Sequence, residues 1–363
     1  MTYMNLIDVC DFQGGSQPPK DKWITQYKDG YIRMLQIRDF TQKRDERDYV
    51  EVSNRIKICK KDDVLIARYG ASVGKILTGL EGAYNVAIIK SIPSKLIDKR
   101  YLYYYFNSSY FQNFLKNVGS RAAQAGFNKE DLREAKIFVP KIEHQRNIVS
   151  ILNKSKNLIE RRKNQIEQLD LLVKSKFIEM FGNPITNSKG WNIKLLGEVC
   201  EMKAGKNIKS ADIYEKNNGK LYPCYGGNGL RGYVRDYSHD GNIPLIGRQG
   251  ALCGNVKYAK GKFYATEHAV VTNPKIEMNT YWLYYILEQL DLNRLSTGAA
   301  QPGLTVGKLK EVELPIAPIG MQNDFENFAK QVDKLKFEME KSLKELEDNF
   351  NSLMNKAFKG ELF

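Results

Sequence analysis

The clearest pattern in the chain is a spacing of three or four residues between apolar positions in two long segments, 142–182 and 319–363. This period is typical of an amphipathic helix. Past the first turn, neither segment contains proline or glycine before Gly182 or Gly360, which stand where a helix would end. The apolar positions are Ile148, Leu152, Ile159, Ile166, Leu169, Val173, Phe177 and Met180 in the first segment, and Phe325, Phe328, Val332, Leu335, Met339, Leu343, Leu346, Phe350, Leu353 and Ala357 in the second.

A helix of about 39 residues is roughly 58 Å long, and a lone amphipathic helix of that length is not stable in water. The two stripes therefore need a partner, and the simplest arrangement packs the two helices against each other. The alternative is that each helix packs separately on its own domain. In both cases the stripe is a packing surface and not a cofactor site.

Shorter elements are predicted in the segment before each long helix. Apolar runs of three or four residues, such as 64–67 and 244–246, are bounded by glycines and predict β-strands. A tyrosine-rich stretch follows in each segment, at 101–115 and 281–292, and predicts a helix. A turn containing Ala-Gln and a short polar helix then lead to the long helix.

These two halves of the chain are copies of each other. The sequence of 65–74 matches that of 245–254 at an offset of 180, with Leu, Ile, Arg, Gly, Ala and the last Gly shared. Tyrosines at 101, 104 and 105 recur at 281, 284 and 285, and the sequence of 122–126 recurs at 299–303. Because the order of the matches is kept while the offset drifts, we expect two copies of one α+β unit of about 180 residues, with loops of different length.

The charge and the cysteine content of the chain limit the molecules that it could bind and the compartment in which it could work. The 363 residues carry a net charge of +14, with no apolar run long enough to span a membrane and no recognisable signal peptide. The five cysteines lie far apart without a Cys-x-x-Cys pair, which argues against disulfides and a zinc site and favours a reducing, cytoplasmic location. The segments 1–141 and 183–318 carry +8 and +5, and the two long helices together only +1. This division predicts two basic heads that bind nucleic acid.

Catalytic and metal-binding motifs are absent from the sequence, so we expect no catalytic residue and no metal ligand. The three histidines are scattered, and the loop Gly70–Gly74 is one residue too short for a phosphate loop and is followed by Ile76 instead of Ser or Thr. No glycine-rich cofactor loop follows a strand. A solitary methyltransferase or nuclease is therefore the least favoured of three functions, behind a DNA-reading protein and an architectural coiled-coil protein that binds nucleic acid without sequence preference.

Polar side chains set among glycines are the candidates for contacts to bases, because Arg pairs well with guanine and Asn or Gln with adenine, while glycine lets the backbone approach. Lysines and backbone amides would contact phosphates. The alternative for each residue is a turn or an ordinary surface position. The candidates are Arg33, Gln36, Arg38, Arg68, Tyr69, Ser72, Lys75, Arg121, Gln124, Asn128 and Lys129 in the first half, and Tyr225, Asn228, Arg231, Arg248, Gln249, Asn255, Gln301 and Thr305 in the second.

Several of these motifs together resemble those of the specificity (S) subunits of type I restriction-modification systems. The shared features are Leu-Ile-x-Arg-x-Gly-Ala in both halves, the segments 222–229 and 265–269, and the ends of both long helices at 177–184 and 357–363. Each half also has the family's exit motif, in which Pro140 comes five residues before Gln145 and Pro318 comes four residues before Gln322. In this chain His144 and Met321 replace the glutamate that usually precedes the glutamine. The resemblance covers nearly the whole chain.

The resemblance implies an α/β (α+β) fold in which two target-recognition domains, 1–141 and 183–318, are related by a pseudo-two-fold axis. Two long helices, 142–182 and 319–363, would form an antiparallel coiled coil that brings the chain ends close together. Each domain would read one half of a bipartite, asymmetric target in double-stranded DNA, and the coiled coil would set the spacer. The implied partners are two methyltransferase (modification) subunits and the restriction (translocase-nuclease) subunits. S-adenosylmethionine, ATP and Mg²⁺ would bind to those partners and not to this chain.

Overall fold

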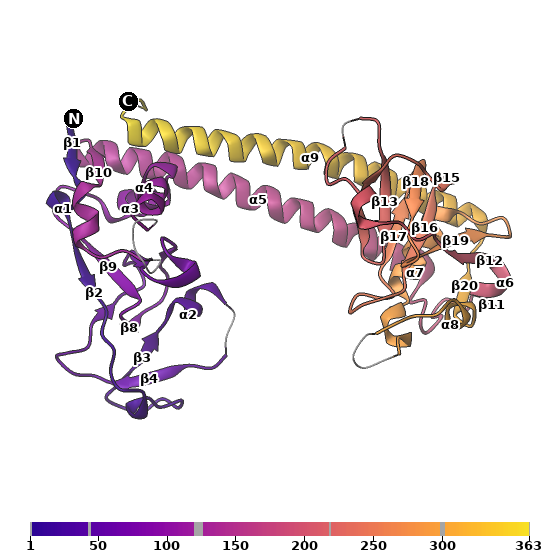
Figure 1. Ribbon diagram of the computed structural model, residues 1–363, viewed down its shortest axis with the longest axis horizontal. Coiled ribbons are helices and arrows are strands. Elements are labelled where there is room, and N and C mark those ends of the chain that lie inside the picture. The colour runs from indigo at the N-terminus through magenta and orange to yellow at the C-terminus, as the bar shows by residue number, and fades with distance from the viewer. Residues whose placement is uncertain (1, 43–44, 120–125, 218, 298–301, 363) are drawn as a thin grey trace. The chain divides into compact units, whose positions relative to one another are not determined.

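The computed structural model describes residues 2–42, 45–119, 126–217, 219–297 and 302–362 (Figure 1). The chain forms two compact units. Unit 1 combines Met1–Lys163 with Lys341–Phe363, and unit 2 is Asn164–Glu340. The helices α5 (Ile142–Phe181) and α9 (Ile319–Lys359) each contribute residues to both units. The predicted domains place each long helix apart from the two heads, whereas in the structure each long helix is divided between the two compact units.

Unit 1 contains three sheets. Their strand orders are β1-β10, β2-β9-β6-β7 and β4-β3-β8-β5, and among the described strands only the pair β3–β8 is parallel. The strands are β1 (Thr2–Asn5), β2 (Cys10–Gly14), β3 (Tyr31–Leu35), β4 (Asp48–Glu51), β5 (Ile58–Cys59), β6 (Leu65–Ala67), β7 (Ile76–Leu77), β8 (Gly82–Tyr84), β9 (Ile88–Pro93) and β10 (Lys136–Val139). The α-helices before α5 are α1 (Leu6–Val9), α2 (Ile37–Thr41), α3 (Lys99–Asn107) and α4 (Ser109–Gly119).

Unit 2 repeats this topology strand for strand. Its sheets are β11-β20, β12-β19-β16-β17 and β14-β13-β18-β15, so each strand number is ten higher than that of its counterpart. The strands are β11 (Asn192–Leu195), β12 (Cys200–Ala204), β13 (Tyr222–Gly226), β14 (Gly229–Val234), β15 (His239–Asp240), β16 (Ile243–Gly247), β17 (Val256–Ala259), β18 (Lys262–Ala265), β19 (Ala269–Pro274) and β20 (Glu313–Ile316), with α6 (Leu196–Val199), α7 (Thr280–Gln289) and α8 (Val306–Lys310). The predicted internal repeat is thus confirmed.

The long helices run antiparallel to each other within each unit. In unit 1, Lys163 of α5 pairs with Glu347 of α9 at 2.8 Å, while earlier residues of α5 share a hydrophobic core with later residues of α9. In unit 2, Lys336 of α9 pairs with Asp170 of α5 at 2.6 Å, and the rings of Phe177 and Phe325 lie 5.3 Å apart. The same cores include residues of the sheets and short helices. The apolar stripe of each long helix therefore packs both against the other long helix and against the sheets and short helices of the units. The structure thus combines the two arrangements predicted from the sequence, in which the helices pack on each other or on the domains.

Glycines end both long helices, as predicted. Gly182 and Gly360 adopt φ values of 76° and 72°, a left-handed conformation that glycine reaches without a Cβ penalty. The amide of Glu361 donates to the carbonyl of Lys356, which closes the last turn of α9. Near this end, the Tyr3 hydroxyl donates to the carbonyl of Phe358, so the two termini lie side by side within unit 1 (Figure 1).

A buried glutamine fixes the start of each long helix to its unit. The Gln145 side chain accepts from the amide of Asp98 at 2.8 Å and donates to the carbonyls of Leu96 and Pro140. Gln322 accepts from the amide of Asn279 at 2.9 Å and donates to the carbonyl of Ala317. In each unit the glutamine therefore holds the residue that caps the tyrosine-rich helix, because Asp98 caps α3 and Asn279 caps α7.

The prediction of one continuous helix over 101–115 is wrong. The structure has two helices, α3 and α4, separated at Ser108, whose backbone is extended. The Ser108 hydroxyl donates to the carbonyl of Tyr105 at 2.6 Å and takes a group that a continuing helix would use. The second predicted helix, 281–292, is also shorter than expected. It ends at Gln289, and Asp291 adopts a left-handed conformation with φ of 47°.

All five cysteines are free and buried, in agreement with the prediction of no disulfides. Cys10 and Cys200 occupy equivalent positions at the start of β2 and β12, and burial raises the pKa of both thiols to about 12. They therefore remain protonated at neutral pH and act as small apolar side chains in the two cores. In the part of the chain that the structure describes, no helix is long and apolar enough to cross a membrane.

Candidate nucleic-acid interface

The repeated Arg-x-Gly sequence forms the same loop in both units, between β6 and β7 and between β16 and β17. In unit 1 the amide of Arg68 donates to the carbonyl of Ala87 at 2.8 Å, and the Arg68 carbonyl accepts from the amide of Phe127. In unit 2 the amide of Arg248 donates to the carbonyl of His268 at 3.0 Å, and the Arg248 carbonyl accepts from the amide of Leu304. Two backbone hydrogen bonds therefore hold each arginine, and the pattern of these bonds is the same in both units.

Glycine is required at the start of this loop. Gly70 and Gly250, two residues after each arginine, have φ values of 74° and 85° and accept from the amides of Val73 and Cys253 through their carbonyls. A residue with a side chain is strained in this conformation. The repeated glycine thus has a structural role, whereas Tyr69 and Gln249, which differ between the loops, are not fixed by this conformation.

The two arginine side chains are engaged differently. Arg68 Nε donates to the carbonyl of Phe127 at 3.2 Å, and its guanidinium lies 5.0 Å from the centre of the Tyr69 ring. Tyr69 itself is 46 % exposed. Arg248 Nε, in contrast, is buried and has no hydrogen-bond partner in the described part of the chain. The two loops therefore share their backbone conformation, whereas Arg68 Nε has a hydrogen-bond partner that Arg248 Nε lacks among the described residues.

Three candidates of unit 1, Arg33, Gln36 and Arg38, lie around two carboxylates. Arg33 pairs with Asp39 at 3.1 Å, and the amide of Gln36 donates to the same carboxylate at 2.7 Å. Arg38 pairs with Asp48 at 3.5 Å, and the Gln36 amide group donates to it at 3.4 Å. These side chains form a separate group that packs α2 onto β3 and β4, and a DNA contact would have to compete with these bonds.

The other candidates of unit 1 lie at or near the loop. Ser72 is half-buried and Lys75 is exposed. Asn128 and Asp131 cap each other, since the amide of each donates to the side chain of the other, at 2.7 and 3.1 Å. Lys129 forms an ion pair with Asp11, and its hydrogen bond lowers the pKa of that carboxyl. Two further predicted contacts, Arg121 and Gln124, lie outside the described residues.

In unit 2 the candidates gather on the Arg-x-Gly loop and the neighbouring hairpin. Asn255 donates to Asn228 at 2.9 Å, which links the loop to the turn between β13 and β14. Arg231 donates to the hydroxyl of Ser210 at 2.9 Å from the adjacent strand. The backbone of Gln249 pairs with Gly303, and the Gln249 side chain is exposed.

The remaining candidates of unit 2 have structural contacts. Burial raises the pKa of Tyr225, whose ring lies 5.8 Å from that of Phe263 and packs on a core cluster. Thr305 caps α8 by accepting from the amide of Lys308 at 3.3 Å. Gln301 lies outside the described residues.

The two units differ most after β3 and β13. In unit 1 the chain passes through α2 before it returns as β4, whereas in unit 2 the residues Gly227 and Asn228 join β13 directly to β14. The tight turn places the Gly227 carbonyl only 1.8 Å from where a Cβ on Gly247 would lie. Ala67 occupies the equivalent position in unit 1, where no such turn approaches. The same framework thus carries a helix in one unit and a hairpin in the other beside the repeated loop.

The candidate list lacks Glu267 and His268, which form a turn directly beside Arg248. The backbone contacts align this turn with Val86 and Ala87 of unit 1, because Ala87 and His268 both accept from the loop arginine. Glu267 and His268 thus stand where the other copy has two apolar residues, and an alignment of the two repeats would have revealed this difference. The candidates were polar residues set among glycines, and no glycine stands near Glu267 and His268 in the sequence.

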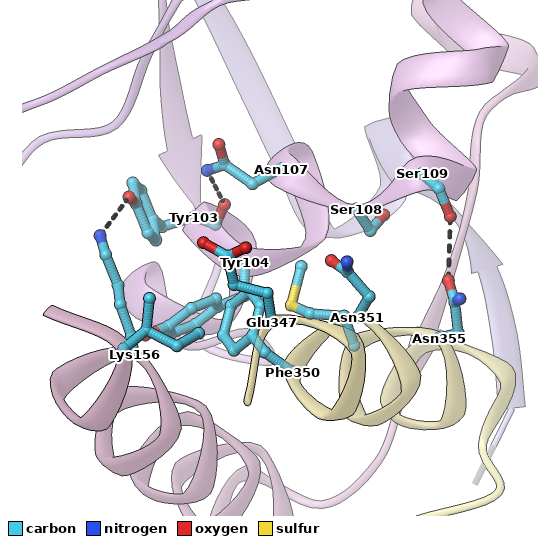
Figure 2. A pocket seen from close by; sticks show the side chains of 12 residues that line it. Tyr103, Tyr104, Asn107, Ser108, Ser109, Lys156, Glu347, Phe350, Asn351 and Asn355 are labelled. Carbon is cyan, nitrogen blue, oxygen red and sulfur yellow. Dashed lines mark hydrogen bonds between the residues drawn. The ribbon is translucent and has the colours of Figure 1, made fainter. Parts of the chain in front are cut away.

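A cavity of about 550 Å³ in unit 1 lies apart from these loops, between α3, α5 and α9 (Figure 2). None of the candidate residues lines it. Its polar rim is largely internally bonded, since Ser109 donates to Asn355 at 2.9 Å and Lys156 to the Tyr103 hydroxyl at 3.3 Å (Figure 2). Apolar side chains such as Phe350 and Met354 form the rest of the wall. This cavity marks the place where the helix break at Ser108 meets the long helices.

Comparison with known proteins gives a consistent result. The family described as "Type I restriction modification DNA specificity domain" matches residues 1–168 and 188–348. The type I restriction enzyme EcoprrI specificity subunit of Escherichia coli is 52 % identical over 130 residues, which is 36 % of this chain and 32 % of that protein. The MjaVIII specificity subunit of Methanocaldococcus jannaschii is 22 % identical over 353 residues, covering 86 % of this chain and 82 % of that protein.

A solved structure shares the fold along its whole length. It is described as the structural basis of complex assembly and conformational transition of the type I R-M system, and it covers 99 % of this chain and 98 % of its own. The TM-score is 0.66 at 18 % sequence identity. The chain thus spans about a third of the length of the E. coli relative by sequence and nearly all of this structure by fold.

Proposed function

Because this chain belongs to the family of type I restriction-modification DNA specificity domains, we propose that it is the subunit that recognises the DNA sequence in such a complex. One observation carries the proposal: a single Arg-x-Gly loop is built twice with the same backbone bonds, on units whose surrounding side chains differ. Two loops that are held in the same way but surrounded by different side chains suit a DNA target made of two different half-sites. The target is then bipartite and asymmetric.

The rest of the complex follows from this role. The chain recruits two methyltransferase subunits and, through the full assembly, the restriction subunits, and the helix pair α5–α9 sets the spacer between the half-sites. The chain itself has no catalytic role. S-adenosylmethionine, ATP and Mg²⁺ bind to the partner subunits. Support comes from the related structure of the type I R-M system, whose description concerns complex assembly.

Methylome sequencing of cells with and without this gene tests the proposal. We expect deletion to remove one methylated motif that has two defined parts separated by an unspecified spacer. A symmetric or single-part motif, or an unchanged methylome, would contradict it. Competition of the purified chain with random duplex DNA distinguishes the architectural alternative, for which the ratio of specific to random binding would be near one. Methylation by the purified chain alone would point to an enzyme.

Replacement of Arg248 by alanine is expected to weaken binding by about 1–3 kcal/mol and to relax the preference at one base pair of one half-site. The reason is that Arg248 has a fixed backbone and that its Nε–H is without a partner among the described residues. Binding-site selection with the full chain measures both effects. Lys260→Ala is the control, because Lys260 is an exposed cation of the same unit and its loss should affect all sequences alike. If Arg248→Ala also weakens all sequences uniformly, Arg248 contacts phosphate instead of a base.

A further inference from the structure

The turn Thr266–Ala269 of unit 2 lies among the residues proposed to read DNA. The amide of Thr266 donates to the carbonyl of Tyr225 at 2.9 Å, and the carbonyl of His268 accepts from the amide of Arg248 at 3.0 Å. Gly227 is close enough that a Cβ there would lie 3.2 Å from the His268 carbonyl. The turn is therefore fixed by backbone bonds between the Arg-x-Gly loop and the β13–β14 hairpin.

Two side chains of this turn carry polar atoms without partners. Glu267 Oε1 lies 3.2 Å from His268 Nε2, while Glu267 Oε2 and His268 Nδ1 are buried and have no hydrogen-bond partner among the residues that the structure describes. Arg248, whose backbone amide donates to the carbonyl of His268, also has a buried Nε without a partner among the described residues. A buried polar atom without a partner costs free energy, and such atoms are rare in native proteins. Here an unused carboxylate acceptor and an unused guanidinium donor arise from neighbouring backbone segments.

The fold does not require this arrangement. Unit 1 builds the same turn with Val86 and Ala87, and the Ala87 carbonyl accepts from Arg68 just as His268 accepts from Arg248. A carboxylate on a basic DNA-binding surface also opposes non-specific binding, since it repels phosphates. Glu267 is thus a residue that neither packing nor general affinity for DNA explains.

We propose that Glu267 is a specificity-determining residue that accepts a hydrogen bond from the exocyclic N4 amino group of a cytosine in the major groove. Arg248 donates to the paired guanine. A C·G pair presents one amino donor on cytosine and two acceptors on guanine, which complement a carboxylate and a guanidinium. Here the two groups come from backbone segments that are hydrogen-bonded to each other. The Glu267 side chain is 34 % exposed, so a rotation of the side chain turns its free oxygen outward. This inference rests on the proposed function.

The Glu267→Gln variant tests the inference, because glutamine keeps the size of the side chain and favours adenine, to which it can both donate and accept. We expect binding-site selection with the full chain to change one position of one half-site, with the preference for cytosine over adenine falling about tenfold or more. The other half-site should be unchanged, and its recognition also shows that the variant chain is folded. Glu277→Gln is the matched control, because Glu277 is an exposed glutamate of the same unit.

The outcomes separate the inference from the function on which it rests. If the wild-type chain selects no bipartite sequence, the proposed function itself fails. If the wild type selects such a sequence and Glu267→Gln selects the same one, Glu267 does not read a base. If Glu267→Gln only raises affinity for all sequences, as Glu277→Gln is expected to do slightly, Glu267 acts through general charge and the inference is overturned.

Discussion

Replacement of Phe177 by alanine is expected to lower the stability of unit 2 by about 3–5 kcal/mol, the usual cost of removing a buried aromatic ring. Phe177 lies on α5, is fully buried, and its ring centre is 5.0 Å from that of Phe181 and 5.3 Å from that of Phe325 on α9. The ring also stacks near Tyr285 of α7. One side chain therefore joins both long helices to the body of unit 2.

Amide hydrogen exchange of the full chain measures this effect separately in the two units. Protection in the sheets of unit 2 should fall strongly, because their core loses the ring that α5 inserts. Leu172→Ala is the control on the same helix, since Leu172 is 47 % exposed and its loss should change stability by no more than about 0.5 kcal/mol. Equal losses of protection in the two variants would mean that α5 stabilises unit 2 by its presence and not by this contact.

Replacement of Gln145 by alanine is expected to lower the stability of unit 1 by about 3 kcal/mol or more. The variant loses three hydrogen bonds of a fully buried amide group and leaves the Asp98 amide and two carbonyls without their partners, each at a cost of about 1–3 kcal/mol. Gln145→Glu should be worse at neutral pH, because a carboxylate cannot donate to the carbonyls of Leu96 and Pro140.

Chemical denaturation followed by hydrogen exchange checks this prediction. Asn147→Ala is the control, because it removes an exposed amide group two residues along the same helix. Gln322→Ala should destabilise unit 2 in the same manner, since Gln322 bonds to the amide of Asn279 and the carbonyl of Ala317. A stable Gln145→Ala variant with unchanged protection of α3 would show that water replaces the side chain and that the bonds do not fix the helix start.

Features that depend on local sequence were predicted well. The three-to-four spacing identified both long helices and their glycine ends, and the offset of 180 identified two loops whose backbones are now seen to match bond for bond. Both follow from periodicity and from conformations that only glycine adopts easily. The break of the tyrosine-rich helix was missed, because Ser108 is neither proline nor glycine. It acts through its hydroxyl, which donates to the carbonyl of Tyr105 and accepts from the amide of Phe111.

Features that depend on contacts across the fold were not predictable in this way. Arg33 and Arg38 were candidates for base contacts, yet Asp39 of α2 pairs with Arg33 and the return of β4 brings Asp48 to Arg38. Glu267 did not fit a search for cationic and amide readers, and only the placement of its turn beside Arg248 makes it a candidate. Pairing partners far apart in the chain depend on strand register, and a single sequence contains little information on that register.

The composition of unit 1 has a consequence for the order of folding during synthesis. Its core requires Met354, Ala357 and Phe358, which leave the ribosome more than 190 residues after Lys163, whereas unit 2 is one continuous stretch of chain. Unit 2 can therefore close first, although its sequence comes second. Until α9 arrives, the aromatic face of Tyr101 and Tyr105 lacks the ring of Phe358, which lies 5.1 and 5.6 Å from theirs. The nascent first half is thus the stage most exposed to aggregation and most in need of a chaperone.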